Sequence, residues 1–207
     1  MSQKFKVERV SQYKGKTLEI DFDTRDPIFI HADIAFDYHV LAGLEMSEGA
    51  ICEVIRANDT RRAKERALYL LDERDYSYVE LFKKLEKNYD EDICFEVLNR
   101  LVELGCINDR RYAMKLAEHL CVTKKYGYYR AREQMRVKGV PNELIDEALA
   151  EFEDDTLDRL EELVERKYAK YLTDEKGYNK VKSALVRLGY SFSDINAVLE
   201  NFEESEE

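Results

Sequence analysis

The feature that most constrains this chain is an internal repeat of about fifty residues. A shift of fifty residues places Gly127 on Ser77 in one direction and on Gly177 in the other, and the same shift places Gly139 on Gly189. Self-similarity of this length is typical of stacked supersecondary units, each too small to bury its own apolar face. The sequence therefore predicts three structural copies, and we expect the function to lie on an extended surface.

Within one copy the apolar residues fall into three stripes with helical spacing. These stripes are Ala113, Leu116, Ala117 and Leu120, then Ala131 and Met135, then Leu144, Ala148, Leu149 and Phe152. The breaks between them contain Gly127 and Gly139-Val140-Pro141, where glycine suits the left-handed end of a helix and proline suits a helix start. Each copy is therefore predicted to hold three helices.

The first thirty residues follow a different pattern, in which apolar and polar residues alternate as in β-strands. Two alternating runs flank the turn Lys14-Gly15-Lys16 and predict a hairpin, to which residues 28–30 add a third strand. We expect the sheet to pack on a short helix capped by Asp33 and stopped by Gly43, through Ile34, Phe36, Tyr38 and Leu41. An alternative is that the hairpin offers an edge strand to a partner.

From Ser47 onward the sequence predicts nearly continuous helix, with a break at Asn58-Asp59-Thr60 where capping residues gather. The predicted fold is mainly α, with tandem three-helix repeats in three copies preceded by a small N-terminal β-hairpin module. The predicted domains are the N-terminal module at 1–58, then repeats at 59–106, 107–153 and 154–207, the last with an acidic tail of Glu203, Glu204, Glu206 and Glu207.

The composition, 44% hydrophobic and 37% charged residues over 207 positions, is that of a helix-rich soluble chain. No apolar run approaches the length of a membrane span and no secretory leader is recognisable, so we expect a cytoplasmic location and no membrane contact. The four cysteines form no C-x-x-C pair and are expected to be buried reduced thiols. His31, His39 and His119 fit no metal or triad pattern, and we expect no enzyme, cofactor or metal site.

Charge is distributed unevenly: −4 over residues 1–60, −2 over 61–106, +1 over 107–153 and −6 over 154–207. The middle repeat alone is basic, and on its second helix the positions of Tyr129, Arg132 and Arg136 share one face opposite Ala131 and Met135. Arginine and tyrosine together are typical of protein interfaces and of single-stranded nucleic-acid grooves. The simpler alternative is a solvated helix face. A net charge of −11 weighs against autonomous DNA binding and favours a protein partner or a composite partner that contains nucleic acid.

The chain also resembles the RecX family of recombinase regulators. The residues that carry the resemblance are Ala67-Leu68, Leu70-Leu71, Arg74, Ser77, Glu80-Leu81, Lys84-Leu85, Leu101, Leu104-Gly105, Asn108 to Ala113, Lys125, Gly127, Arg130, Lys138-Gly139-Val140, Ile145 and Ala148-Leu149. The likeness covers about Ala63 to Phe202. The chain departs from the pattern at Asn88, where a Lys-Gly pair would be expected, and its N-terminal module is not shared by all members.

The resemblance implies an all-helical crescent that lies in the groove of the RecA filament on DNA and acts in DNA repair, recombination and the SOS response. It implies a monomer without enzyme activity that limits filament extension and inhibits the ATPase, recombinase and coprotease activities of RecA. We expect the contact cluster to be Lys124, Lys125, Tyr129, Arg130, Arg132, Arg136 and Lys138. Two alternatives remain: a module that binds single-stranded DNA without RecA, which includes weak DNA contact, and a helical scaffold for an unrelated partner.

Overall fold

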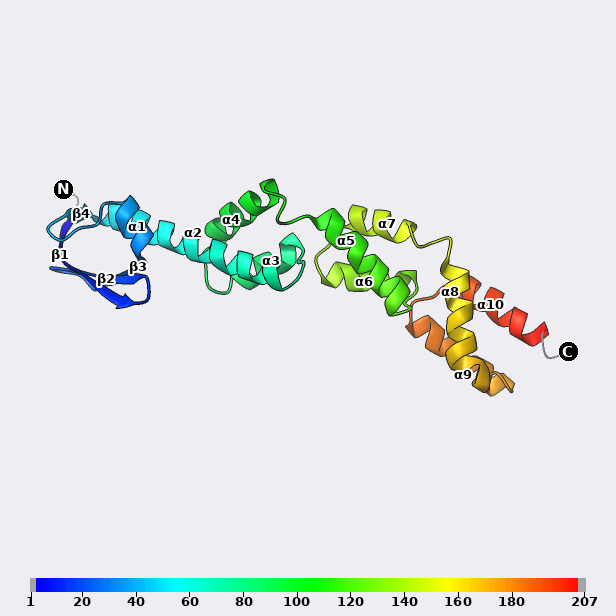
Figure 1. The fold of residues 1–207 in the computed structure, drawn as a ribbon. Coiled ribbons are helices and arrows are strands. Elements are labelled where there is room, and N and C mark those ends of the chain that lie inside the picture. The colour runs from blue at the N-terminus through cyan, green and yellow to red at the C-terminus, as the bar shows by residue number, and fades with distance from the viewer. Residues whose placement is uncertain (1–2, 205–207) are drawn as a thin grey trace. The chain divides into compact units, whose positions relative to one another are not determined.

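The computed structural model describes residues 3–204, with side-chain environments to residue 202, and resolves the chain into two compact units (Figure 1). The first unit runs up to Arg74 and includes Phe82–Leu104. The second consists of Asp75–Leu81 and the chain from Gly105 onward. The predicted tail residues Glu206 and Glu207 lie outside the described part of the chain.

The first unit opens with a four-stranded antiparallel sheet in the order β3-β2-β1-β4. Its strands are β1 (Lys4–Lys14), β2 (Thr17–Phe22), β3 (Ile28–His31) and β4 (Glu45–Ser47). The predicted hairpin and third strand are confirmed. The sequence did not reveal β4, because three residues are too few to show an alternation; the strand is defined by its pairing with β1, as at Phe5 and Met46.

The packing of the sheet agrees only in part with the prediction. Helix α1 (Ala32–Asp37) buries Ile34 and Ala35, but Phe36 is 77% exposed and Leu41 is 67% exposed, with Tyr38 also exposed. Ile51 and Val54 of helix α2 (Glu48–Glu73) cover the apolar face of the sheet together with Ile34 and Ala35 of α1. A six-residue helix has too little apolar surface to cover four strands, so the longer helix supplies the rest.

The ends predicted for α1 are also wrong. The N-cap is His31, whose ring nitrogen accepts a hydrogen bond from the backbone N–H of Asp33 at 3.1 Å, so Asp33 is a helical residue rather than the cap. The helix ends at Asp37, with Tyr38 as its C-cap, well before Gly43.

Helix α2 runs without interruption through the break predicted at Asn58-Asp59-Thr60. Asn58 is 4% exposed, and its side-chain oxygen accepts a hydrogen bond from the backbone N–H of His31 at 2.9 Å. The side-chain amide of Asn58, predicted to cap a helix, therefore accepts a hydrogen bond from the last residue of β3 instead. Figure 1 shows α2 extending from the sheet to the neighbourhood of α4, so the boundary predicted at residue 58 falls inside one helix.

Each repeat contains three helical segments, which confirms the predicted organisation. The first repeat holds the end of α2, then α3 (Tyr78–Leu85) and α4 (Glu91–Glu103). The second holds α5 (Asp109–Glu118) with a π-helical end at His119–Thr123, then α6 (Tyr128–Val137) and α7 (Asn142–Ala150). The third holds α8 (Thr156–Leu163), a π-turn at Val164–Tyr168, a 3₁₀ turn at Ala169–Tyr171, α9 (Glu175–Arg187) and α10 (Phe192–Glu204).

The second repeat has a core of its own, and it is built from the predicted stripes. Ala113, Ala117, Ala131, Met135 and Ala148 are each at most 1% exposed, and Ile145, which the predicted stripes did not include, is fully buried whereas Leu144 is only partly buried. The third repeat has an equivalent core around Leu160, Val164, Leu185 and Ile195.

Of the two glycines predicted at the helix breaks of the second repeat, Gly139 has the predicted conformation, and so does its equivalent in the third repeat, Gly189. Gly139 has φ +76° and Gly189 has φ +89°, the left-handed region that suits a helix end. Gly127 is extended, with φ −75°, and Lys125 takes the left-handed conformation in its place, with φ 54°. A side chain at Gly127 would collide with the backbone of Gly189. Glycine is therefore required here because of the limited space, and not because of its backbone conformation.

The first amides of a helix have no partner within that helix, and the repeats satisfy them in three ways. At the start of α3, the N–H of Tyr78 donates to Asp109 of the next repeat at 2.8 Å. At the start of α6, the N–H of Gly127 donates to the carbonyl of Leu188 in the next repeat at 2.9 Å. At the start of α9, the N–H of Gly177 donates to Asp174 of the same repeat at 2.7 Å.

The four cysteines are free, but only Cys94 and Cys121 are buried, whereas Cys52 and Cys106 are exposed, contrary to the prediction for those two. Burial raises the pKa of both the Cys94 and the Cys121 thiol. None of the helices in the described residues is long and apolar enough to cross a membrane.

Candidate functional site

The predicted contact cluster centres on α6, whose two faces differ sharply. Ala131 and Met135 are fully buried against the core of the second repeat. On the outer side Tyr129 is 63% exposed and Val137 is 65% exposed, and the side chain of Arg136 is 56% exposed. The outward face of α6 thus presents an aromatic ring, a guanidinium and an aliphatic group to solvent.

Two arginines of this helix pair with carboxylates within the second repeat. Arg132 donates from Nε to Asp146 of α7 at 3.2 Å, and the same carboxylate raises the pKa of Arg132 and accepts a hydrogen bond from Tyr128. Arg136 pairs with Glu133, one turn earlier, at 3.2 Å. Exposed pairs of this kind exchange readily for contacts with a partner, because each contributes little to stability.

Arg130 has a structural position that the sequence did not indicate. Its guanidinium lies 4.2 Å from the ring centroid of Tyr126 and donates to the carbonyl of Arg187 at the end of α9 at 3.0 Å. A cation at a helix C-terminus satisfies an open carbonyl and opposes the negative end of the helix dipole. Arg130 therefore joins the second repeat to the third.

Lys125 also joins these two repeats. Its Nζ lies 2.6 Å from a carboxylate oxygen of Glu162 on α8, and its backbone carbonyl accepts a hydrogen bond from the hydroxyl of Tyr190 at 3.1 Å. The ammonium lowers the pKa of Glu162. Burial is the main cause that raises the pKa of Tyr190 to about 12.

Lys138 joins the second repeat to the first. Its Nζ lies 3.1 Å from Glu80 of α3, and its carbonyl accepts a hydrogen bond from the hydroxyl of Ser77 at 2.5 Å. Ser77 is fully buried and also accepts a hydrogen bond from the N–H of Glu80 at 3.1 Å, so one hydroxyl both caps α3 and holds the next repeat.

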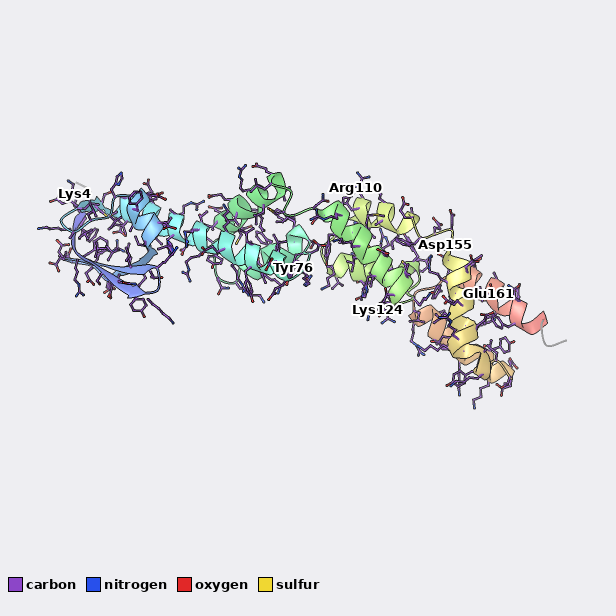
Figure 2. All side chains as sticks on the ribbon, in the orientation of Figure 1. Lys4, Tyr76, Arg110, Lys124, Asp155 and Glu161 are labelled. Carbon is purple, nitrogen blue, oxygen red and sulfur yellow. The ribbon has the colours of Figure 1, made fainter. Side chains whose placement is uncertain are left out.

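Lys124, labelled in Figure 2, is exposed and follows the π-helical end of the α5 segment, where its N–H donates to the carbonyl of His119. The seven predicted residues therefore divide into two groups. Lys125, Arg130 and Lys138 hold neighbouring repeats together, and Lys124, Tyr129, Arg132 and Arg136 belong to the surface of the second repeat. Among the described residues, no group of three histidine, cysteine or carboxylate side chains is placed to hold a metal ion.

The comparisons with known proteins agree with this repeat organisation. The family models for the first, second and third three-helix domains of RecX match residues 63–101, 108–149 and 153–199. The regulatory protein RecX of Trichlorobacter lovleyi is 35% identical over 140 residues, which cover 65% of this chain and 91% of that protein. The RecX of Clostridioides difficile is 25% identical over 206 residues, covering 96% of this chain and 97% of that protein.

Solved structures show the same fold. A regulatory protein RecX matches with a TM-score of 0.71 at 21% identity, covering 95% of this chain and 99% of that chain. RecX from Lactobacillus salivarius matches with a TM-score of 0.66 at 24% identity, covering 71% of this chain and 98% of that chain. The three consecutive domain matches and the relative at 35% identity lead to one conclusion: this chain belongs to the RecX family of regulatory proteins.

Proposed function

We propose that this chain is a cytoplasmic, monomeric regulator that binds the RecA filament on DNA. Bound there, it inhibits filament extension and the ATPase, recombinase and coprotease activities of RecA, and so acts in DNA repair, recombination and the SOS response. Membership of the RecX family is the observation that carries this proposal. The repeat architecture supports it, because helical repeat proteins typically act by binding through their surface and require no catalytic group.

The proposed contact surface is the outward face of α6 with its flanking lysines. Tyr129 and Arg136 are its central residues, since both are exposed and arginine and tyrosine dominate the energetics of protein interfaces. Arg132 and Lys124 extend this surface. Lys125, Arg130 and Lys138 contribute through the backbone positions that they fix, because their charged groups are already engaged by neighbouring repeats.

The proposal is tested by measuring DNA-dependent ATP hydrolysis by RecA as the chain is added at increasing ratio. We expect progressive inhibition that approaches completion. Unchanged hydrolysis at excess protein would exclude the proposal.

The surface is tested with Arg136→Glu, for which we expect half-inhibition to require roughly tenfold more protein. Arg100→Glu is a matched control, because Arg100 also pairs with a glutamate three residues away and is 62% exposed, but lies on α4. Equal loss in both variants would indicate a nonspecific charge effect and remove Arg136 from the interface.

A second function, binding of single-stranded DNA without RecA, is favoured by one observation. Tyr128 and Tyr129 are both exposed, with ring centroids 5.5 Å apart, beside the arginines of α6, and aromatic rings with cations form the usual surface for unpaired bases. Titration of an oligonucleotide at several salt concentrations separates the two functions. Direct phosphate contact requires affinity to fall steeply with salt.

A further inference from the structure

The second unit contains a cavity of about 270 Å³ beside the start of α6. The segment that joins α7 to α8 contributes to the lining, together with residues of α7, α8 and α10 and the π-helical end of the α5 segment. Asp155, labelled in Figure 2, belongs to this joining segment. The cavity adjoins the outward face of α6 through Tyr128, which lines it.

Aromatic and aliphatic side chains form much of the cavity wall. These residues are Tyr126, Tyr128, Leu149, Phe152 and Leu157. Tyr128 and Leu157 are each 46% exposed, so an incoming group can reach them. The ring of Tyr126 already interacts with the guanidinium of Arg130, and such rings attract cations through their electron-rich faces.

Three carboxylates also line the cavity: Glu153, Asp154 and Asp194. Within residues 3–202, none of the three forms an ion pair with a lysine, arginine or histidine. Other acidic groups of the same two repeats do have such partners, as Asp146 and Glu162 show. The cavity thus combines apolar walls with carboxylates that are available for a cation from outside.

Among the described residues that line the cavity, Arg159 is the one cation, and its charge is largely engaged. Its side chain is only 12% exposed, and it donates to the carbonyl of Phe152 and to the hydroxyl of Thr156. Asp155 lies 3.8 Å from the same guanidinium. With three carboxylates and one guanidinium, the lining is net negative, so it repels phosphate and favours a positively charged group.

We propose that this cavity receives a lysine or arginine side chain of a partner protein. The aliphatic stem would lie along Leu157 and Phe152, while the cationic head reaches Asp154, Glu153 or Asp194. Where that partner is the RecA filament, the inference rests on the proposed function and adds a second contact. The α6 face then binds groups that accept from arginine, and the cavity beside it binds a cation, which fixes the orientation of the partner.

The cavity itself is tested without RecA, by NMR titration of the full chain with N-acetyl-arginine amide. We expect shifts of the Tyr128 and Leu157 amides with this probe, and none with N-acetyl-norleucine amide, which has an aliphatic stem but no charge. The double substitution Asp154→Asn with Asp194→Asn should abolish the shifts, whereas Asp158→Asn, outside the lining, should leave them unchanged. Equal shifts with both probes, or shifts elsewhere only, would overturn the assignment.

A binding measurement with RecA filaments separates this inference from the proposed function. If the filaments bind the wild-type chain, we expect Asp154→Lys with Asp194→Lys to weaken binding about tenfold. Undiminished binding by that variant would remove the cavity from the RecA contact. If the wild-type chain does not bind RecA, the proposed function fails, and the arginine-amide titration still decides whether the cavity binds a cationic side chain.

Discussion

At the junction of the first and second repeats, the start of α3 is held by side chains, whereas at the next junction the start of α6 is held by its backbone. Ser77 reaches the carbonyl of Lys138 with its hydroxyl. Gly127, the equivalent residue one repeat later, donates its own N–H to the carbonyl of Leu188. We name these contacts the first junction and the second junction.

The two junctions also differ in which repeat supplies the acidic and which the basic partner of an ion pair. In the first junction the earlier repeat supplies the acid, Asp75, and the later repeat supplies Lys115, with 2.6 Å between their charged atoms. In the second junction the earlier repeat supplies Lys125 and the later one supplies Glu162, again at 2.6 Å. The same helical unit therefore tolerates opposite polarity at its ends, provided that the helix amides and carbonyls remain satisfied.

Alanine substitutions at three glycines with left-handed backbone conformation should have the largest effects on stability, and the loss should be greater at the second junction than at the first. Gly189→Ala should destabilise by about 3 kcal/mol, since the new Cβ would collide with the backbone nitrogen of Arg130 in addition to the conformational strain. Gly139→Ala should cost about 2 kcal/mol, because its Cβ would lie 2.5 Å from Cβ of Val79, a side chain that can shift. Urea unfolding monitored by circular dichroism measures these differences.

Gly105→Ala is the control for this series. Gly105 has φ +70°, and a methyl group added there would have no neighbour within 4 Å among the described residues, so only strain of about 1 kcal/mol is expected. If Gly105→Ala costs as much as Gly189→Ala, close packing at the second junction is not the reason for glycine there.

Ser77→Ala should destabilise the chain by about 2 kcal/mol. The substitution removes the donor to Lys138 and the acceptor for the N–H of Glu80, both at a fully buried position. Ser191→Ala is the matched control, because Ser191 accepts from the N–H of Asp194 as a cap but donates to no carbonyl of another repeat within the described residues. We expect about 1 kcal/mol there by the same denaturation assay. Equal costs would show that the hydroxyl serves only as a cap.

Tyr190→Phe should cost about 1 kcal/mol at neutral pH, through loss of the hydrogen bond to the carbonyl of Lys125. The pH dependence of this difference in unfolding free energy shows whether it comes from the neutral hydroxyl of Tyr190. The pKa of Tyr190 is raised from 10.0 to about 12, so the wild-type contribution is complete below pH 10 and is lost as the pH rises from 10 to 12. Unfolding free energies of the two proteins across this range should therefore converge. Parallel curves would contradict a buried, neutral Tyr190.

Lys125→Glu tests the reversed polarity of the second junction and should have the smallest effect. It places a carboxylate opposite Glu162 without changing the left-handed backbone requirement at position 125. Adding Glu162→Lys restores an ion pair of the polarity found in the first junction. We expect the urea midpoint to fall in the single variant and to recover in the double variant; no recovery would mean that the pair is not coupled.

Much of the fold followed from local patterns, and the errors arose where distant residues intervened. The stripes around Ala113 and Met135 and the alternation before Phe22 are local, and they were interpreted correctly. Asn58 has the composition of a cap, but its side chain instead accepts from the open N–H of His31, 27 residues away. No local spacing reveals such a partner.

The same limit explains the mixed outcome for the contact cluster. Lys125, Arg130 and Lys138 contact groups that lie 37, 57 and 58 residues away. Their positive charge and their proximity in sequence predicted one shared surface. The repeat of about fifty residues was more informative, because each of these residues contacts a group in a neighbouring copy. A residue beside a repeat break is close to the neighbouring copy, and a charged residue there is a candidate for holding two copies together.

The hydrogen bond from Gly177 to Asp174 sets α9 apart from α3 and α6. The amide at the start of this helix is satisfied locally, and a side chain at Gly177 would collide with the carbonyl of Tyr171. At the starts of α3 and α6, by contrast, amides donate to acceptors of the following repeat. The first turn of α9 is thus complete within its own repeat, because one aspartate supplies the acceptor that the following repeat supplies to Tyr78 and Gly127.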